Sequence, residues 1–276
     1  MRFLYLLAQP LAFIIRPIYE LIGNYGLTLI IVTLLIRIIT IPLTFASQKS
    51  AAKTQMLQPE IQKIQQKYKN DREKMSAELQ KFYTKNDINP MGGCFPLIVQ
   101  MFVLFGFIDV IYKPLKYILQ LSANQIESIR NAVGAAVTKV PYEVSLCGME
   151  GVKEQIIALG KEPINFEFLG IDLTSMLKGN LGDFRMWIFP VLAVLATLLT
   201  SFMSKQQMSQ NQSGENAASM SNTMLWMMPA MTAYFTYIMP AGMSLYWFVS
   251  SLAQVVQQYI TNKVIKKEKE ALKGKK

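Results

Sequence analysis

The chain has 276 residues, of which 51% are apolar, and a net charge of +10 at pH 7. It holds no histidine and only two cysteines, which excludes histidine-dependent catalytic triads and the common zinc sites. No nucleophile and base pair is recognisable, so we expect no enzyme, no cofactor and no metal. The apolar residues gather in runs that approach or reach membrane-spanning length, which predicts an all-α integral membrane protein.

The amino end, residues 1–22, is apolar but interrupted. The apolar run contains Pro10 and is followed closely by Arg16, Pro17 and Glu20. Such a segment is typical of a helix that lies at the membrane interface, and we predict an N-terminal interfacial helix. A signal-like anchor is the alternative, although no clear cleavage site follows.

Residues 23–46 are predicted to form the first membrane span, and Arg37 lies in its middle. A charge at that depth costs on the order of 3 kcal/mol on insertion scales, so Arg37 must face protein, water or a partner. Thr33, Arg37, Thr40 and Thr44 follow one another at i, i+4, i+7 and i+11, which places them within roughly 60° of a helical wheel. This helix therefore carries one polar stripe with a cation at its centre. The alternative is an arginine that an acidic neighbour neutralises in a packed bundle.

Residues 47–90 are predicted to form an antiparallel helical hairpin in the cytoplasm. Two sets of apolar residues at spacings of four and three flank a polar turn at residues 69–71, and Pro59 should kink or restart the first helix. The first set is Leu57, Ile61, Ile64 and Tyr68, and the second is Met75, Leu79 and Phe82. These two narrow apolar sets form a thin seam between the helices that buries little surface. We therefore expect the hairpin to be mobile.

Lysine and arginine in the loops set the predicted orientation, because cytoplasmic loops carry an excess of both. They are dense in the hairpin and in the carboxyl tail, whereas the long segment after the second span is richer in acids. Five spans with the amino end outside and the carboxyl end inside a bacterial plasma membrane fit this pattern. The remaining predicted segments are 91–119 (second span), 120–185 (extracellular loop region), 186–204 (third span), 205–222 (polar, flexible cytoplasmic loop), 223–239 (fourth span), 240–262 (fifth span) and 263–276 (basic cytoplasmic tail).

Within the extracellular region, two amphipathic helices are expected near residues 126–137 and 152–159, both on the outer membrane surface. Asp109, near the outer end of the second span, is expected at the outer boundary, where a salt bridge would neutralise it.

Polar side chains recur on the other predicted spans. A single serine or threonine in a membrane helix usually forms a hydrogen bond to a neighbouring helix. Stripes on three helices in the same half of the membrane, together with Arg37, instead indicate a wet cavity that opens to the cytoplasm. The stripes comprise Thr197, Thr200, Ser201 and Ser204 on the third span, Ser244, Trp247, Ser251, Gln254 and Gln258 on the fifth, and Gln100 on the second.

Several ordered motifs resemble the YidC family of membrane protein insertases, in the short form of bacteria with one membrane. They are Thr33-Leu34-Leu35-Ile36-Arg37, Ile41-Pro42-Leu43-Thr44, Met56-Leu57-Gln58-Pro59, residues 89–101, Pro240-Ala241-Gly242, Leu245-Tyr246-Trp247 and Gln257-Gln258. Residues 122–163 depart from the family pattern as an expanded outer loop.

The resemblance implies five membrane helices around a hydrophilic groove that is closed to the outside and open to cytoplasm and lipid. By position, Arg37 matches the groove arginine, Thr33 a groove threonine, Gln100 the groove glutamine, and Trp247 an aromatic residue that contacts substrate. The third span's usual glutamine is replaced near Ser201. The full set of expected groove residues is Arg37, Thr33, Thr40, Thr44, Gln100, Thr200, Ser201, Trp247, Ser251 and Gln254.

The function that this resemblance implies is insertion of nascent membrane proteins without ATP. Hydrophilic tails would cross through the groove and transmembrane helices would leave into lipid. The expected partners are nascent membrane proteins, the Sec translocon, membrane lipids, and the ribosome through the basic tail and cytoplasmic loops, with no specific DNA. A small anion transporter or channel with Arg37 as its anion site is the alternative, but we find no repeated halves and no glycine-broken span. A structural assembly factor is a third hypothesis.

Overall fold

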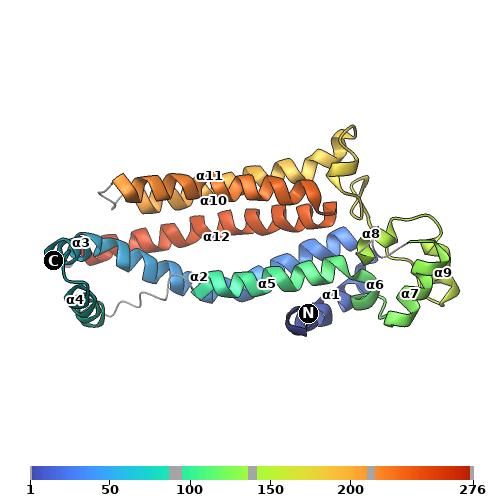
Figure 1. The fold of residues 1–276 in the computed structure, drawn as a ribbon, viewed down its shortest axis with the longest axis horizontal. Helices are drawn as coiled ribbons and strands as arrows, with labels where there is room; N and C mark the ends of the chain where they lie inside the picture. The colour runs from blue at the N-terminus through green and yellow to red at the C-terminus, as the bar shows by residue number, and fades with distance from the viewer. Residues whose placement is uncertain (1, 87–94, 136–141, 210–214, 274–276) are drawn as a thin grey trace.

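The computed structural model describes residues 2–86, 95–135, 142–209 and 215–273, and most of them are helical. Five long helices run along the long axis of the molecule, with a helical hairpin at one end and a small mixed cap at the other (Figure 1). The long helices are α2 (Tyr25–Met56), α5 (Phe95–Tyr112), α10 (Ile188–Ser209), α11 (Glu215–Ile238) and α12 (Ala241–Lys273).

Two segments within the described residues are long and apolar enough to cross a membrane, Tyr25–Ser50 and Phe184–Ser204, and Ile98–Tyr112 is a shorter apolar helix. All five long helices also expose large apolar side chains, among them Ile39, Phe102, Leu195, Met227 and Val256. Apolar surface spread along so many helices is typical of contact with lipid rather than water.

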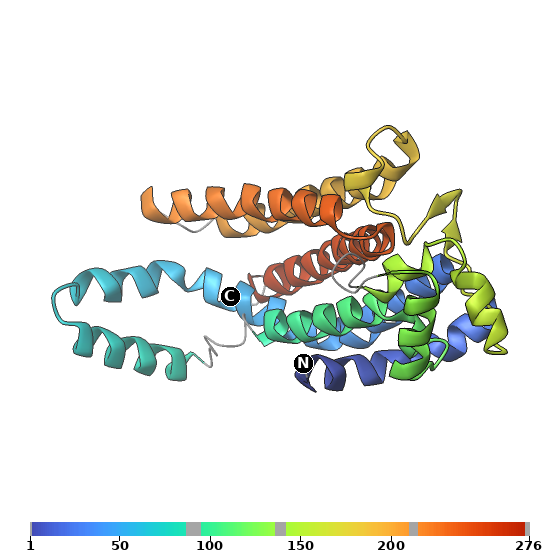
Figure 2. The same cartoon turned by 45° about the vertical axis from the view of Figure 1, so that its right-hand side comes forward.

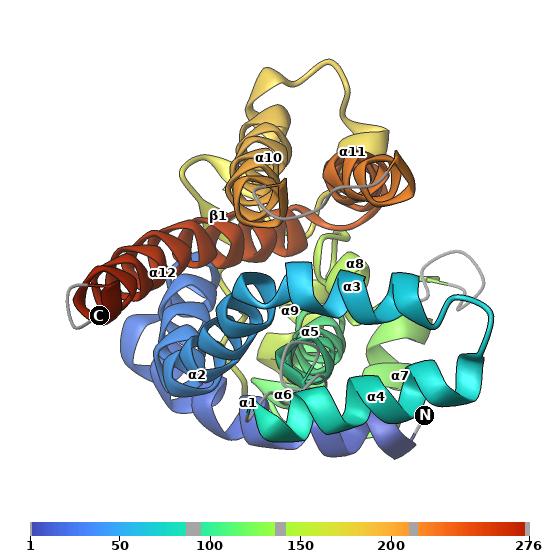
Figure 3. The same ribbon diagram turned by 90° about the vertical axis from the view of Figure 1, so that its left-hand side faces the viewer.

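Helix α1 (Arg2–Ile22) lies across the bundle, as the view down the long axis shows (Figure 3). Its buried residues Ala8, Leu11 and Ile15 join the main core, whereas Phe13 and Leu21 are 83% and 87% exposed. This crosswise position and the exposed apolar side chains favour the interfacial helix over a spanning anchor. The helix ends at Gly23, whose φ of +69° suits a glycine C-cap, and Asn24 Oδ1 then accepts from the Leu27 amide as α2 begins.

Helix α2 continues without a break to Met56, whereas the sequence analysis assigned residues 47–56 to the hairpin. The hairpin itself consists of α3 (Gln58–Lys67) and α4 (Arg72–Lys85), which project from the bundle (Figure 2). Pro59 lies in the first turn of α3, where a missing amide costs nothing, so it restarts the helix as predicted. Asp71 caps α4 by accepting from the Lys74 amide at 3.0 Å. Ile61 is the one buried residue of the two helices, so the seam is as thin as expected.

Three further boundaries differ from the prediction. The second span ends at Tyr112 rather than residue 119, because Pro114 cannot continue a helix and instead starts α6 (Pro114–Tyr117). The segment 205–222, expected as a flexible loop, is helical to Ser209 and again from Glu215, because alanine, glutamine and methionine propagate helices well. The basic tail likewise continues α12 as far as Lys273.

The cap contains the two helices that the sequence predicted, as α7 (Ala123–Ala132) and α9 (Val152–Ala158). Their apolar faces do not remain available to a membrane surface, because Ile129, Val152 and Ile156 are buried in the core. The cap also contains α8 (Glu143–Cys147), the short helical turns η1 (Leu177–Gly179) and η2 (Phe184–Trp187), and two short strands, β1 (Glu167–Phe168) and β2 (Ile171–Asp172).

The two strands pair antiparallel through a turn that the sequence analysis missed. Glu167 pairs with Asp172, and Leu169 and Gly170 between them have φ values of 54° and 73°, as a two-residue hairpin turn requires. This β-hairpin fastens the cap to α2, because the Phe168 ring packs directly on Gly26. The contact is so close that the Cβ of any other residue at position 26 would lie 2.4 Å from the ring.

The cap also binds the turn between α11 and α12. The Gly242 amide donates to the Leu173 carbonyl at 3.0 Å, and the Ala241 amide donates to the Ser175 carbonyl at 2.8 Å. The cap therefore holds together the ends of α2, α11 and α12 that lie nearest to it.

Candidate functional site around Arg37

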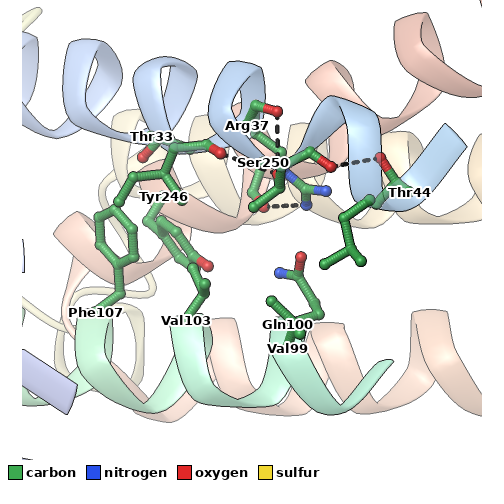
Figure 4. Close-up of a pocket in the computed structure, with 12 residues that line it drawn as sticks. Thr33, Arg37, Thr44, Val99, Gln100, Val103, Phe107, Tyr246 and Ser250 are labelled. Carbon is green, nitrogen blue, oxygen red and sulfur yellow. Dashed lines mark hydrogen bonds between the residues drawn. The ribbon is translucent and has the colours of Figure 1, made fainter. Parts of the chain in front are cut away.

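Helices α2, α5 and α12 enclose a small cavity around the Arg37 side chain (Figure 4). Its volume is about 10 Å³, which is room for about one water molecule. The lining residues come from α2 (Thr33, Ile36, Arg37, Thr40, Leu43 and Thr44), α5 (Val99, Gln100, Val103 and Phe107) and α12 (Tyr246 and Ser250). Five of the ten predicted groove residues thus meet at one place: Thr33, Arg37, Thr40, Thr44 and Gln100.

Arg37 is half-buried and donates from a terminal nitrogen to Ser250 Oγ at 2.5 Å. No acidic side chain within the described ranges forms an ion pair with it. The alternative of a structural arginine held by a carboxylate therefore finds no support in the described part of the chain. A guanidinium has five N–H donors, so one hydroxyl leaves most of its hydrogen-bonding capacity for water or a ligand.

The polar stripe of α2 becomes more open from Thr33 towards Thr44. Thr33 is 2% exposed and donates to the Leu29 carbonyl at 2.6 Å, whereas Thr40 and Thr44 are half-buried. All three hydroxyls donate to carbonyls of their own helix, so each keeps an oxygen that accepts from a partner. Thr44 accepts from Gln257 of α12.

An aromatic pair closes the cavity at the end nearer the cap. The rings of Phe107 and Tyr246 stack with centroids 4.4 Å apart, and they are 1% and 2% exposed. Gln100 lies on α5 across the cavity from Arg37, farther from the cap than Phe107 and Tyr246, and points its amide toward the guanidinium (Figure 4). The cavity is therefore closed towards the cap and polar towards the hairpin end of the bundle.

The other five predicted residues do not line this cavity. Ser251 Oγ lies 3.3 Å from Thr197 Oγ1, and nearby Gln258 donates to Ser204 at 3.1 Å, so this face of α12 packs against α10. Thr200 is buried and donates to the Thr197 carbonyl of its own helix. The Ser251–Thr197 and Gln258–Ser204 contacts join two helices, which is the role that the sequence analysis weighed against a groove.

The remaining three predicted residues lie in different settings. Ser201 is half-buried on α10. The Trp247 ring stacks on Phe235 of α11, with centroids 5.7 Å apart. Gln254 is exposed, and on the helical wheel it lies between the residues of α12 that face α2 and those that face α10. The groove role of all five residues stays a prediction.

Residues 17–269 match the family described as 60Kd inner membrane protein. A curated protein of Fusobacterium nucleatum named "Membrane protein insertase YidC" is 30% identical over 258 residues, which cover 94% of this chain and 96% of the relative. The chain belongs to the YidC family.

Other relatives of the same name differ in length. The Clostridium perfringens YidC is 31% identical over 91% of this chain and 85% of its own. The Geobacter sulfurreducens YidC is 27% identical over 94% of this chain, but the match spans only 38% of that relative. Membership of the family makes this chain a membrane protein, as the resemblance of its motifs implied.

Sequence reasoning missed three residues that this YidC family member places at the cavity or beside it. Tyr246 and Ser250 line it, and Gln257 donates to Thr44. They lie at i, i+4 and i+11 on α12, which is the spacing of Thr33, Arg37 and Thr44 on α2. A search of every span for that spacing would have found them.

A second polar cluster lies at the cap end of α5. Asp109 is 6% exposed, pairs with Lys113 and accepts from the Tyr117 hydroxyl at 2.5 Å, so the expected salt bridge is confirmed. Glu143 of α8 accepts from the Lys116 amide at 3.0 Å, and burial raises the pKa of Glu143 to about 7. This cluster fastens α5 and α6 to the cap. Within the described ranges, no group of three or more His, Cys, Asp or Glu is placed to hold a metal ion.

Proposed function

We propose that this chain is a membrane protein insertase that moves hydrophilic tails of nascent membrane proteins across the bilayer and releases their helices into lipid, without ATP. The observation that carries the proposal is Arg37, a cation inside an apolar helix that bonds to Ser250 and to no carboxylate of the described residues. Membership of the YidC family, whose relatives carry the insertase name, supports it.

The mechanism lowers the cost of desolvating a polar tail. Each unpaired polar group that enters hydrocarbon costs several kcal/mol. A polar space that reaches part of the way across the membrane shortens the dry path, and Arg37 offers a counter-charge to acids in the tail. Gln100 supplies hydrogen bonds beside that charge, and Thr40 and Thr44 supply them on its cytoplasmic side.

The cavity of about 10 Å³ is too small for a peptide. A tail must therefore separate α5 from α2 and α12 on entry. The helix that follows the tail then leaves on the lipid-facing side near Trp247, and its transfer into lipid drives the reaction. The stacked Phe107 and Tyr246 rings keep the space closed towards the outside until the tail arrives.

We place the five long helices across a bacterial plasma membrane, with the amino end and the cap outside and the hairpin and carboxyl end in the cytoplasm. The lysines of the hairpin, of which Lys63, Lys74 and Lys81 are exposed, favour this orientation and suit contact with the ribosome. The Sec translocon is a further proposed partner.

Insertion into liposomes that contain only this protein tests the proposal. The substrate is a single-span protein with an acidic tail, and its matched control carries Asn and Gln in place of the tail acids. Arg37→Ala should lower insertion of the acidic substrate about tenfold, because the counter-charge is lost, and should change insertion of the neutral one much less. Equal insertion of the acidic substrate by both proteins would exclude the counter-charge role.

The same liposomes separate the rival functions. A transporter or channel would carry small anions across the membrane without any substrate protein, and an assembly factor would insert nothing by itself. The insertase should insert the substrate and leave anion flux at the level of empty liposomes.

A further inference from the structure

A second cavity, of about 610 Å³, lies between α1 and the segment that follows α5, away from Arg37. Its walls are Gln9, Ala12, Phe13, Arg16, Pro17 and Glu20 of α1, Lys116 and Tyr117 of α6, and Gln120 and Leu121. The volume is within the range of sites that hold small organic ligands, and is far larger than a single ion requires.

The charges on the walls favour a monoanionic ligand. Arg16 and Lys116 oppose one acid, Glu20, which leaves a net formal charge of +1. Glu20 accepts from Arg16 Nε at 2.7 Å, so the two terminal nitrogens of the guanidinium are left out of that ion pair. Arginine and lysine together are the side chains that bind phosphate groups best.

The same walls carry polar amides and an apolar ring. Gln9 and Gln120 provide amide donors, and Gln120 is held at φ +55°, a backbone conformation that non-glycine residues rarely adopt. Phe13 lines the cavity and is 83% exposed. Cations for a phosphate, amides for ester oxygens and a ring for acyl carbons match the kinds of group that a phospholipid carries.

We infer that this cavity binds the phosphodiester headgroup of an anionic membrane lipid, of which phosphatidylglycerol is the simplest example. The crosswise helix α1 carries the cavity at the capped end of the bundle, beside exposed apolar side chains that suit the membrane interface. The bound lipid fastens α1 to α6 through Arg16 and Lys116. This site goes beyond insertase activity and uses none of the residues around Arg37.

Retention of lipid by the purified full chain tests the site. The protein is reconstituted in nanodiscs with equal amounts of phosphatidylglycerol and phosphatidylcholine of the same acyl chains, and retained lipids are counted by native mass spectrometry. The double variant Arg16→Gln/Lys116→Gln should lower the retained phosphatidylglycerol about tenfold or more, since each cation near a membrane surface contributes about fivefold. The matched control Lys161→Gln/Lys178→Gln removes two exposed cations from the cap and should retain the wild-type amount.

Two further arms keep the inference falsifiable if the double variant folds poorly. Glu20→Gln raises the net charge of the walls to +2 and should increase phosphatidylglycerol retention several-fold. Soluble glycerol phosphate at the same concentration should not displace the lipid, because it lacks the acyl chains that contact Phe13. Equal retention of both lipids by the wild type, no increase with Glu20→Gln, or displacement by glycerol phosphate would each overturn the lipid site. Arg37→Ala should leave retention unchanged, which separates this inference from the proposed insertase mechanism.

Discussion

Ser250 and Ser251 are neighbours in sequence, but they contact different helices. Ser250 accepts from Arg37, whereas Ser251 lies 3.3 Å from Thr197 of α10. Ser250→Ala should lower insertion of an acidic-tailed substrate by about twofold to fivefold, because a hydrogen bond to a charged group that orients the guanidinium is lost. Reconstituted insertion at fixed protein amounts measures the effect.

The control for this change is Ser251→Ala in the same assay. It removes an interhelical contact worth about 0.6 kcal/mol on average, so it should lower thermal stability slightly and leave the preference for acidic tails unchanged. If the two variants lose the same fraction of activity on acidic and neutral substrates, Ser250 acts through packing and not through Arg37.

The polar residues of α2 could be predicted from the sequence because a charge in an apolar helix leaves few alternatives. Thr33, Arg37, Thr40 and Thr44 do line one cavity, and Gln100 faces them from α5. Helix α12 was harder to predict because it has polar residues on two faces. The sequence analysis took the face of Ser251, which packs on α10, and overlooked the face of Ser250, which meets α2. Periodicity shows that a face is polar, but not which neighbour it meets.

Glu143 should make the cap sensitive to pH. Burial raises its pKa from an ordinary 4.5 to about 7, so between these values the folded chain holds a proton that the unfolded chain releases. The stability of the cap should therefore fall as the pH rises from about 4.5 to about 7, by on the order of 1–3 kcal/mol, and stay level above that range. Hydrogen exchange of residues 115–117 and 143–147, corrected for intrinsic rates, measures this change.

The variant Glu143→Gln provides the decisive comparison. Its amide oxygen still accepts from the Lys116 amide, but it does not titrate, so protection should become independent of pH in that window. Glu154→Gln, an exposed acid of the same cap, should keep the wild-type slope. A slope that survives Glu143→Gln would assign the pH dependence to another group.

At the scale of elements, the α3–α4 hairpin depends on one buried side chain. Ile61 is 2% exposed, and no residue of α4 is buried. Ile61→Ala should open the hairpin and raise the rate of trypsin cleavage within residues 58–85 about thirtyfold, because lost burial of this size costs about 2 kcal/mol. The half-buried Ile64 provides the control, and Ile64→Ala should have a clearly smaller effect. Equal cleavage rates in wild type and Ile61→Ala would show that the seam contributes nothing to the hairpin.

Helices with a regular spacing of apolar residues were predictable from the sequence, but the residues at which they end were not. The sequence analysis predicted a helix over residues 23–46 and two hairpin helices, which correspond to α2, α3 and α4, but it ended the first of them at residue 46, where polarity begins, while α2 continues to Met56. Loss of apolar residues marks where a helix leaves the membrane, whereas the helix itself ends only at a residue that breaks its hydrogen bonds. The β1–β2 hairpin escaped prediction because its strands have two residues each, too few to show an alternating pattern.

At the scale of the whole molecule, the polar parts lie at opposite ends of the long axis. The hairpin lies at one end and the cap at the other, with the long helices and their exposed apolar side chains between them (Figure 1). A membrane around the middle of this molecule must therefore separate the two ends. Charge predicts that the hairpin end faces the cytoplasm, because lysine is dense in the hairpin and acids are frequent in the cap.

Cysteine labelling tests both the separation and its direction. In a Cys94→Ala/Cys147→Ala background, Lys161→Cys reports on the cap and Ser76→Cys on the hairpin, and both positions are exposed. A membrane-impermeant maleimide added to intact spheroplasts should label Lys161→Cys within minutes and Ser76→Cys only after permeabilisation. The reverse labelling pattern would keep the two ends on opposite sides of the membrane but invert the orientation. The polar side of the Arg37 cavity would then face outside, and a tail emerging from the ribosome would have no path into it. Labelling of both positions in intact cells would contradict the membrane crossing of α5, because α5 is the long helix that joins the hairpin to the cap.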